Sequence, residues 1–151
     1  MTEETTIICK SKGGFTLIEV LIALVLMGTA IFALLMSSQS FSQANGAGLE
    51  MSTAEFLTEQ IREQTVAMTF ANLVSTYNNT TVKTYSPPHD SQNIDLTAYP
   101  AYSQKITGKY VLASDLSTVS GSATAFYRIT VDIYLNNTEK ISSASWLRAG
   151  Y

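Results

Sequence analysis

The stretch KSKGGFTLIEVLIALVLMG, residues 10–28, determines how the rest of this sequence is interpreted. It opens an apolar block, residues 15–36, in which Glu19 is the one charged residue. As an α-helix this block would be about 33 Å long, and the hydrocarbon core of a bilayer is about 30 Å thick. The block is therefore long and apolar enough to span a membrane.

The residues before the block predict its orientation. Lys10 and Lys12 stand on the amino side, and positive residues next to a membrane helix favour the cytoplasmic side. A cleaved signal peptide and a plain membrane anchor both remain open at this point. A signal peptide has a shorter apolar core, however, and ends in small residues at its cleavage site.

Neither interpretation accounts for Glu19. A carboxylate at the centre of a membrane helix costs about 2.5–3.5 kcal/mol on insertion scales, so a positive partner is expected. The sequence has no Lys or Arg between Phe15 and Gln60. A new amino terminus, made by cutting the chain just before Phe15, would supply the missing positive charge.

Gly14-Phe15-Thr16-Leu17-Ile18-Glu19, with lysines just upstream, resembles the prepilin signal of type IV pilins and type II secretion pseudopilins. The apolar residues 20–24 continue the resemblance. It implies that a membrane-bound prepilin peptidase cuts after Gly14 on the cytoplasmic side and methylates the amino group of Phe15. It also implies that Glu19 is an assembly carboxylate, which pairs with the amine of a neighbouring subunit.

The same resemblance implies a location and a set of partners. The chain would cross the inner, cytoplasmic membrane once, with its amino terminus in the cytoplasm and its head on the periplasmic or extracytoplasmic side. It would then enter a pilus or pseudopilus filament. The implied partners are membrane lipid before assembly, prepilin peptidase, the inner-membrane assembly platform and other pilin or pseudopilin subunits.

The helix is expected to continue beyond the apolar block. No proline occurs before Pro87, and Ala54, Leu57, Ile61, Thr65 and Met68 follow one another at spacings of three or four. That periodicity is typical of one face of an amphipathic helix, which we expect to end at residues 74–77. Three glycines lower helix propensity and are candidate positions for bending: Gly28, Gly46 and Gly48.

The carboxyl-terminal part predicts a small antiparallel sheet. Residues 126–135, FYRITVDIYL, alternate apolar and polar side chains as in a half-buried strand. We expect a turn at residues 136–139, a returning strand at 141–147, and a preceding strand at 109–113 that starts as early as Gln104. Residues 77–102, with all three prolines, and residues 114–123 are expected to be loops.

These elements predict an α+β fold of the pilin-like kind, in which a long N-terminal helix packs on a small C-terminal antiparallel sheet. The expected core joins one helix face to one strand face: Leu57, Ile61 and Met68 against Ile129, Val131 and Ile133. The expected parts are a leader at residues 1–14, a transmembrane and filament-core helix at 15–36, its amphipathic continuation at 37–77, and a head at 78–151.

Composition argues against several other classes of function. The net charge is −3 and no basic cluster occurs, so no direct nucleic-acid partner is expected. The single cysteine, Cys9, and the single histidine, His89, cannot form an internal disulfide or a zinc cage, so we expect no metal and no cofactor. No GxSxG, P-loop or GxGxxG motif occurs, and we expect no enzyme activity.

A second, looser resemblance concerns the type of subunit. The hairpin RITVDIYL…ISSASWL and the helix segment AEFLTEQIR are similar to those of I-type pseudopilins and V-type minor pilins. This implies a minor subunit that helps to start or assemble a type II secretion pseudopilus or a type IV pilus. The alternatives are a DNA-uptake pseudopilin, or a filament-tip adhesive subunit with these aromatic residues exposed: Tyr99, Tyr102, Tyr110 and Trp146.

Overall fold

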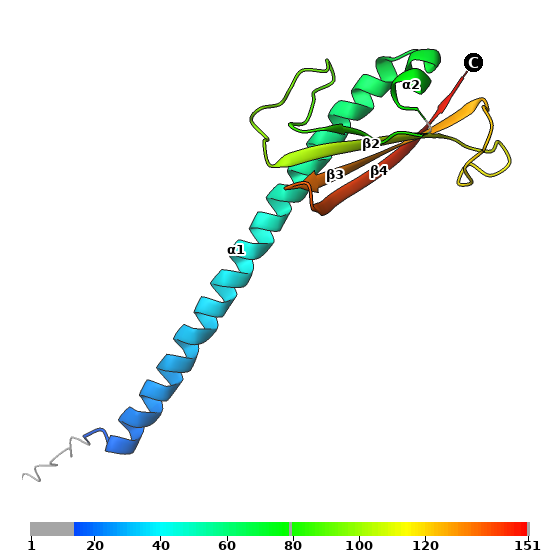
Figure 1. Ribbon diagram of the computed structural model, residues 1–151. Helices are drawn as coiled ribbons and strands as arrows, with labels where there is room; N and C mark the ends of the chain where they lie inside the picture. Colours follow the sequence, from blue (N-terminus) through cyan, green and yellow to red (C-terminus); the bar gives the residue numbers. More distant parts are fainter. Residues whose placement is uncertain (1–13, 79, 151) are drawn as a thin grey trace, which may run out of the picture. The chain divides into compact units, whose positions relative to one another are not determined.

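The computed structural model describes residues 14–78 and 80–150, so Cys9, Lys10 and Lys12 lie outside the described residues. Its elements follow one another along the chain as two helices and then four strands (Figure 1): α1 Leu17–Ala67, α2 Phe70–Thr76, β1 Lys83–Tyr85, β2 Tyr102–Tyr110, β3 Phe126–Leu135 and β4 Glu139–Ala149. The sheet has the order β1-β2-β3-β4, and every neighbouring pair is antiparallel. The α+β fold class predicted from the sequence is confirmed.

The chain divides into two compact units, one up to Ala44 and the other from Asn45 onward. In the first unit the described residues form the beginning of α1, and all their side chains are exposed. The helix runs without a break through Gly28, and it also continues through Gly46 and Gly48 at the start of the second unit. These three glycines therefore do not interrupt α1.

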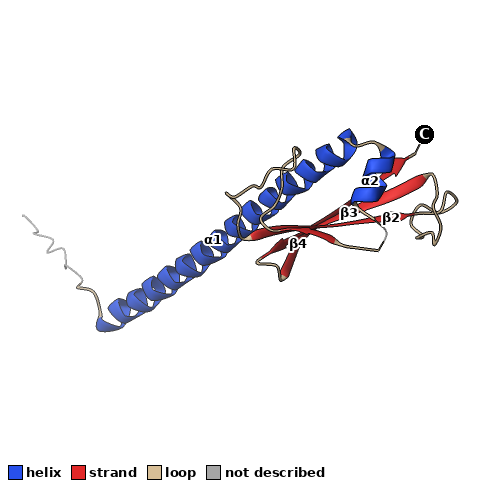
Figure 2. Cartoon of the chain, turned by 45° about the horizontal axis from the view of Figure 1, so that its top comes forward, coloured by secondary structure: helices blue, strands red, loops and turns tan. Residues whose placement is uncertain are grey.

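In the second unit, the remainder of α1 lies across one face of the sheet (Figure 2). The helix contributes Ala54, Leu57 and Ile61, which are fully buried with alternate residues of β3. The strand contributes the three apolar residues predicted from its alternation: Ile129, Val131 and Ile133. The predicted helix–sheet core is confirmed, although Met68 is only partly buried at its margin.

The predicted helix end at residues 74–77 was wrong. α1 ends at Ala67, and a second helix starts after Thr69, whose hydroxyl accepts a hydrogen bond from the Asn72 N–H at 3.4 Å. A threonine that caps the following turn offers the backbone an alternative to continuing the first helix. The apolar spacing extends past this break, which is why periodicity alone did not reveal it.

Strand β3 has the predicted bounds, and residues 136–138 make the turn predicted at 136–139, since Glu139 already belongs to β4. Asn136 and Asn137 have φ of 51° and 59°, values that asparagine tolerates better than most residues and that tight hairpins require. β4 is longer than predicted, covering residues 139–149 in place of 141–147.

The other strand predictions were less accurate. β2 occupies residues 102–110, so it begins close to the early start predicted at Gln104 but ends at Tyr110 and not at Ala113. Its polar and glycine-containing sequence, YSQKITGKY, obscures the alternation. The expected loop at 77–102 contains the short strand β1, which pairs with the first half of β2.

A buried glutamine fixes the loop between β1 and β2 to the helix. Gln104 is fully buried, and its Nε2 donates to the Leu57 carbonyl of α1 and to the His89 carbonyl, both at 3.0 Å. Its Oε1 accepts a hydrogen bond from the His89 N–H at 2.8 Å. These bonds satisfy the buried amide, so the loop is held to the core by specific contacts.

Candidate functional site

The candidate site is the beginning of α1. The Glu19 N–H donates to the Thr16 carbonyl at 3.1 Å and to the Thr16 hydroxyl at 3.3 Å. The Val20 N–H donates to the same carbonyl at 3.3 Å. Thr16 thus satisfies N–H groups that a helix start otherwise leaves without partners.

Glu19 lies in the first turn of α1, and its side chain is exposed. A carboxylate at this place is favoured by the helix dipole, typically by about 0.3–1 kcal/mol. The neighbouring side chains are apolar and equally uncovered, with 84% of Phe15, 83% of Leu17 and 64% of Ile18 exposed. The site therefore presents one carboxylate on an apolar, uncovered helix.

On the carboxyl side of Glu19, a long stretch of the chain contains no Lys or Arg. After Glu19, the next Lys or Arg is Arg62. Over residues 14–78 and 80–150, the ion pairs lie elsewhere, and none of them includes Glu19: Arg62–Glu59, His89–Asp95 and Lys140–Asp132. Within the described part of the chain, no cation pairs with Glu19, so its predicted ammonium partner has to come from elsewhere.

The helix that carries Glu19 has the length and composition of a membrane span. Among the described residues, α1 is the one helix that meets this criterion, and its apolar window is entirely uncovered. A core helix of a soluble protein would have that window buried. The exposed apolar window of α1 is instead typical of a helix surface that lipid or other subunits bury.

Residues 9–35 match the model of the prokaryotic N-terminal methylation motif. The chain carries a prokaryotic N-terminal methylation motif. The matched residues include the predicted cleavage position after Gly14, the predicted methylation position Phe15 and the predicted assembly carboxylate Glu19. No curated protein and no solved structure matches the chain.

The motif supports the type IV pilin and pseudopilin family, whose members are structural subunits processed by prepilin peptidase and assembled with other pilin subunits. Together with an apolar helix near the amino terminus, it fits a pilin anchored in the inner membrane. The roles of Gly14, Phe15 and Glu19 remain predictions at the level of single residues.

The other residues singled out from the sequence lie in the second unit. His89 contacts Asp95 through its Nε2 at 2.7 Å. The four aromatic residues considered for an adhesive surface are partly buried and pack against the core: Tyr99, Tyr102, Tyr110 and Trp146. The indole N–H of Trp146 also donates to the Thr65 hydroxyl at 3.2 Å, so this side chain serves the helix–sheet contact.

The contacts that cap the two ends of α1 were not predicted from the sequence. Thr16-Leu17-Ile18-Glu19 has the T-x-x-E spacing of a capping box, a signal that could have placed the start of α1. Arg148 donates to the carbonyls of Thr65, Val66 and Met68 at 2.8–3.1 Å and so caps the other end of α1. No local pattern indicates that contact, because its partners are about eighty residues away in sequence.

Proposed function

We propose that this chain is a minor pilin or pseudopilin, a structural subunit that helps to start or assemble a type II secretion pseudopilus or a type IV pilus. The observation that supports the proposal most is the exposed Glu19 in the first turn of an uncovered apolar helix, inside a match to the methylation motif. A membrane anchor needs the apolar helix, but it has no need of the carboxylate.

In this proposal, prepilin peptidase cuts after Gly14 and methylates the new amino terminus at Phe15. The methylated amine stays protonated and carries the positive charge that residues 15–60 lack. Before assembly the helix anchors the chain in the inner membrane, with its amino terminus in the cytoplasm and its head outside. The assembly platform then moves it into the filament.

Glu19 gives the filament its register. When apolar helices pack together, they exclude water, and an unpaired buried charge costs several kcal/mol. The ammonium of a neighbouring subunit removes this cost through a charge-assisted hydrogen bond. Registers that leave Glu19 without this partner are therefore disfavoured, so the carboxylate acts on docking more than on overall stability.

The minor role rests on the resemblance of the β3–β4 hairpin and of the helix segment AEFLTEQIR to I-type pseudopilins and V-type minor pilins. Such a subunit is present in few copies and lies close to the filament tip. The burial of its candidate adhesive aromatics favours an assembly role over surface adhesion.

Glu19→Gln tests the proposal because it removes the charge and keeps a side chain of nearly the same shape. We expect normal insertion into the membrane and normal cleavage, but at least about tenfold less recovery in sheared or co-purified filaments, since several kcal/mol depend on the ion pair. Thr16→Ala is the matched control: it removes the helix cap and leaves the carboxylate, so recovery should change little. Normal assembly of Glu19→Gln would contradict the proposal.

A further inference from the structure

The face of the sheet opposite α1 carries an excess of positive charge. Along β3, the residues that alternate with the buried ones point away from the helix, and Arg128 and Asp132 are among them. Four cations lie on this outer face: Lys105, Lys109, Arg128 and Lys140. Asp132 opposes them, and it is paired with Lys140 at 3.5 Å and with the Ser143 hydroxyl at 2.5 Å.

Two of these cations stand directly opposite each other. Lys109 of β2 is the register partner of Arg128 of β3, and like charges at such positions destabilise a sheet. Within the described residues, neither side chain takes part in a salt bridge. Arg128 donates to the Ser117 carbonyl at 2.9 Å, which orients its guanidinium. Besides the hydrogen bonds from Ser117, the charge of Arg128 contributes to the lowered pKa of Asp115 in the same loop, but the guanidinium and this carboxylate form no salt bridge. The Lys109–Arg128 pair would be stabilised by an incoming anion.

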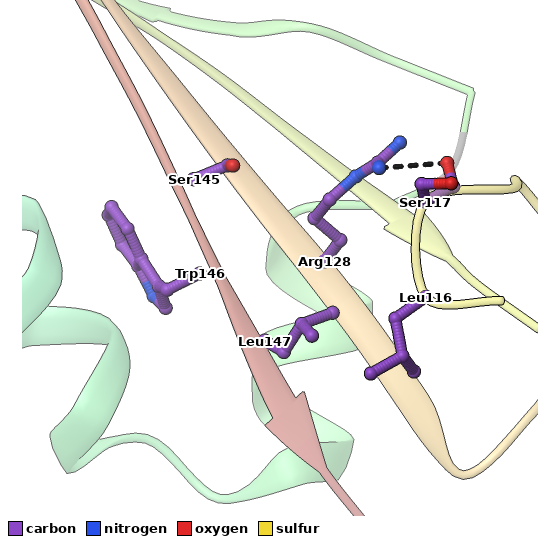
Figure 3. A pocket seen from close by; sticks show the side chains of 6 residues that line it. All are labelled: Leu116, Ser117, Arg128, Ser145, Trp146 and Leu147. Atoms are coloured by element: carbon purple, nitrogen blue, oxygen red, sulfur yellow. Dashed lines mark hydrogen bonds between the residues drawn. The ribbon is translucent and has the colours of Figure 1, made fainter. Parts of the chain in front are cut away.

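A groove of about 370 Å³ lies beside Arg128. The loop after β2 supplies Leu116 and Ser117 to it, while β4 supplies Ser145 and Leu147 (Figure 3). Leu116 is 39% exposed and Leu147 is 42% exposed. The groove thus places two exposed leucines beside the Arg128 side chain, whose guanidinium points toward Ser117 (Figure 3), an arrangement suited to a ligand that is both acidic and apolar.

The same unit presents a surface of that chemistry on its opposite side. On α1, Glu59 and Glu63 are one turn apart and lie on the face turned away from the sheet, where both are exposed. Phe56 precedes Glu59 by three residues and Val66 follows Glu63 by three, and they are 43% and 57% exposed. Glu59 is paired with the exposed Arg62 at 3.4 Å, whereas Glu63 forms no salt bridge among the described residues. The outward surface of this segment therefore keeps a net negative charge flanked by apolar residues, complementary in kind to the groove.

We propose that the groove around Arg128 binds the segment 56–66 of α1 from a second copy of this chain. Glu59 and Glu63 would approach Arg128 and Lys109, while Phe56 and Val66 would cover Leu116 and Leu147. Because the two surfaces lie on opposite sides of the unit, the contact is heterologous: it joins two neighbouring copies without closing a symmetric dimer, and a few copies near the filament tip suffice for it. The inference rests on the proposed function, since membrane anchoring of the copies would bring them together side by side.

Disulfide cross-linking in native membranes tests this contact in the full chain. Two differently tagged copies both carry Cys9→Ser; one also carries Val66→Cys and the other Ser145→Cys. We expect a cross-linked pair that contains both tags. Lys109→Glu with Arg128→Glu in the Ser145→Cys copy should lower its yield at least about tenfold, because like charges then face each other. Adding Glu59→Lys and Glu63→Lys to the Val66→Cys copy should restore it.

The matched control reverses the other two cations of the same face, Lys105→Glu with Lys140→Glu, and should leave the yield unchanged. No cross-linked pair, a yield that charge reversal does not change, or a cross-link to a different pilin alone would overturn the inference. The amino-terminal mass of the same membrane sample separates the two claims. Chains that begin at Phe15 but do not cross-link refute the groove and leave the proposed function standing.

Discussion

At the scale of single residues, Gly108 shows how close the packing of the head is. A Cβ at this position would meet the Tyr77 carbonyl and the ring of Tyr127. The Tyr127 hydroxyl donates to that same carbonyl, so strand β3 is connected to the end of α2 across Gly108. Burial raises the pKa of Tyr127 to about 12, with a further contribution from Tyr110. The neutral, donating form of this phenol is therefore the one that the fold favours.

Gly108→Ala should destabilise the head by about 1–3 kcal/mol, because the added methyl group has no free space and the backbone must shift. Gly121→Ala is the control, since nothing lies within 4 Å of its Cβ position, and it should change stability by less than about 0.5 kcal/mol. Urea unfolding of the full chain in detergent, followed by the fluorescence of the sole tryptophan, measures both variants. Equal stability of the two would show that the contact at Gly108 is relaxed without cost.

At the scale of elements, the end of α1 depends on β4. The last turn of the helix has no basic residue of its own, and Arg148 supplies the positive charge through three hydrogen bonds to carbonyls. Cations at a helix C-terminus are favoured by the dipole and satisfy carbonyls that have no partner within the helix. The end of α1 before Thr69 is therefore fixed both by the local cap of Thr69 and by the tertiary contact from Arg148.

Arg148→Met keeps most of the side-chain volume and removes these bonds. We expect a loss of about 2 kcal/mol, since hydrogen bonds from charged groups contribute about 1.5–3 kcal/mol. Arg62→Met is the control, because its ion pair with Glu59, at 3.4 Å, is exposed and should contribute less than about 1 kcal/mol. A loss for Arg148→Met no larger than for Arg62→Met, in the same urea titration, would mean that β4 does not stabilise the helix end.

The loop after β2 depends on a turn around Asp115. Its carboxylate accepts bonds from the hydroxyls of Ser117 and Thr118, both at 2.5 Å, and from the Ser117 N–H at 3.0 Å. These bonds favour the ionised form and lower the pKa of Asp115 to about 2. A lowered pKa stabilises the folded turn above the ordinary value of 3.8, and this contribution is lost as the pH falls toward 2.

We therefore expect the carboxyl carbon of Asp115 to titrate with a midpoint near pH 2 in an NMR experiment on the full chain in detergent. The amide signals of residues 115–118 should shift over the same pH range. In Ser117→Ala the midpoint should move upward, because the hydrogen bond from the Ser117 hydroxyl is lost. A midpoint near 3.8 in the unaltered chain would show that the turn does not hold the carboxylate in solution.

These elements also show what the sequence could predict. Strand β3 was placed correctly because its alternation reports directly which side chains face the core. β2 was misplaced because a buried glutamine, a glycine and three polar outward residues conceal the same period. The break after Ala67 was missed because one cap residue, Thr69, and one distant arginine decide it, and the apolar spacing carries no trace of either.

At the scale of the whole molecule, the candidate site was the part most accessible from sequence. Gly14, Phe15 and Glu19 belong to a short linear motif that a membrane peptidase is expected to recognise in an extended or helical segment, so their spacing carries the information. The groove beside Arg128 has the opposite character. Its lining residues come from the loop after β2 and from two strands, so no short stretch of sequence indicates it. Only the fold brings Leu116 and Leu147 together in the groove.

If the chain is processed at the motif, it gains the ammonium that Glu19 needs. Mass spectrometry of the intact protein and of its amino-terminal peptide, taken from native membranes, tests this most directly. We expect a chain that begins at Phe15 with one methyl group on its amine. A chain that retains residues 1–14 in cells with an active prepilin peptidase would contradict it, because Glu19 would then lack its proposed partner.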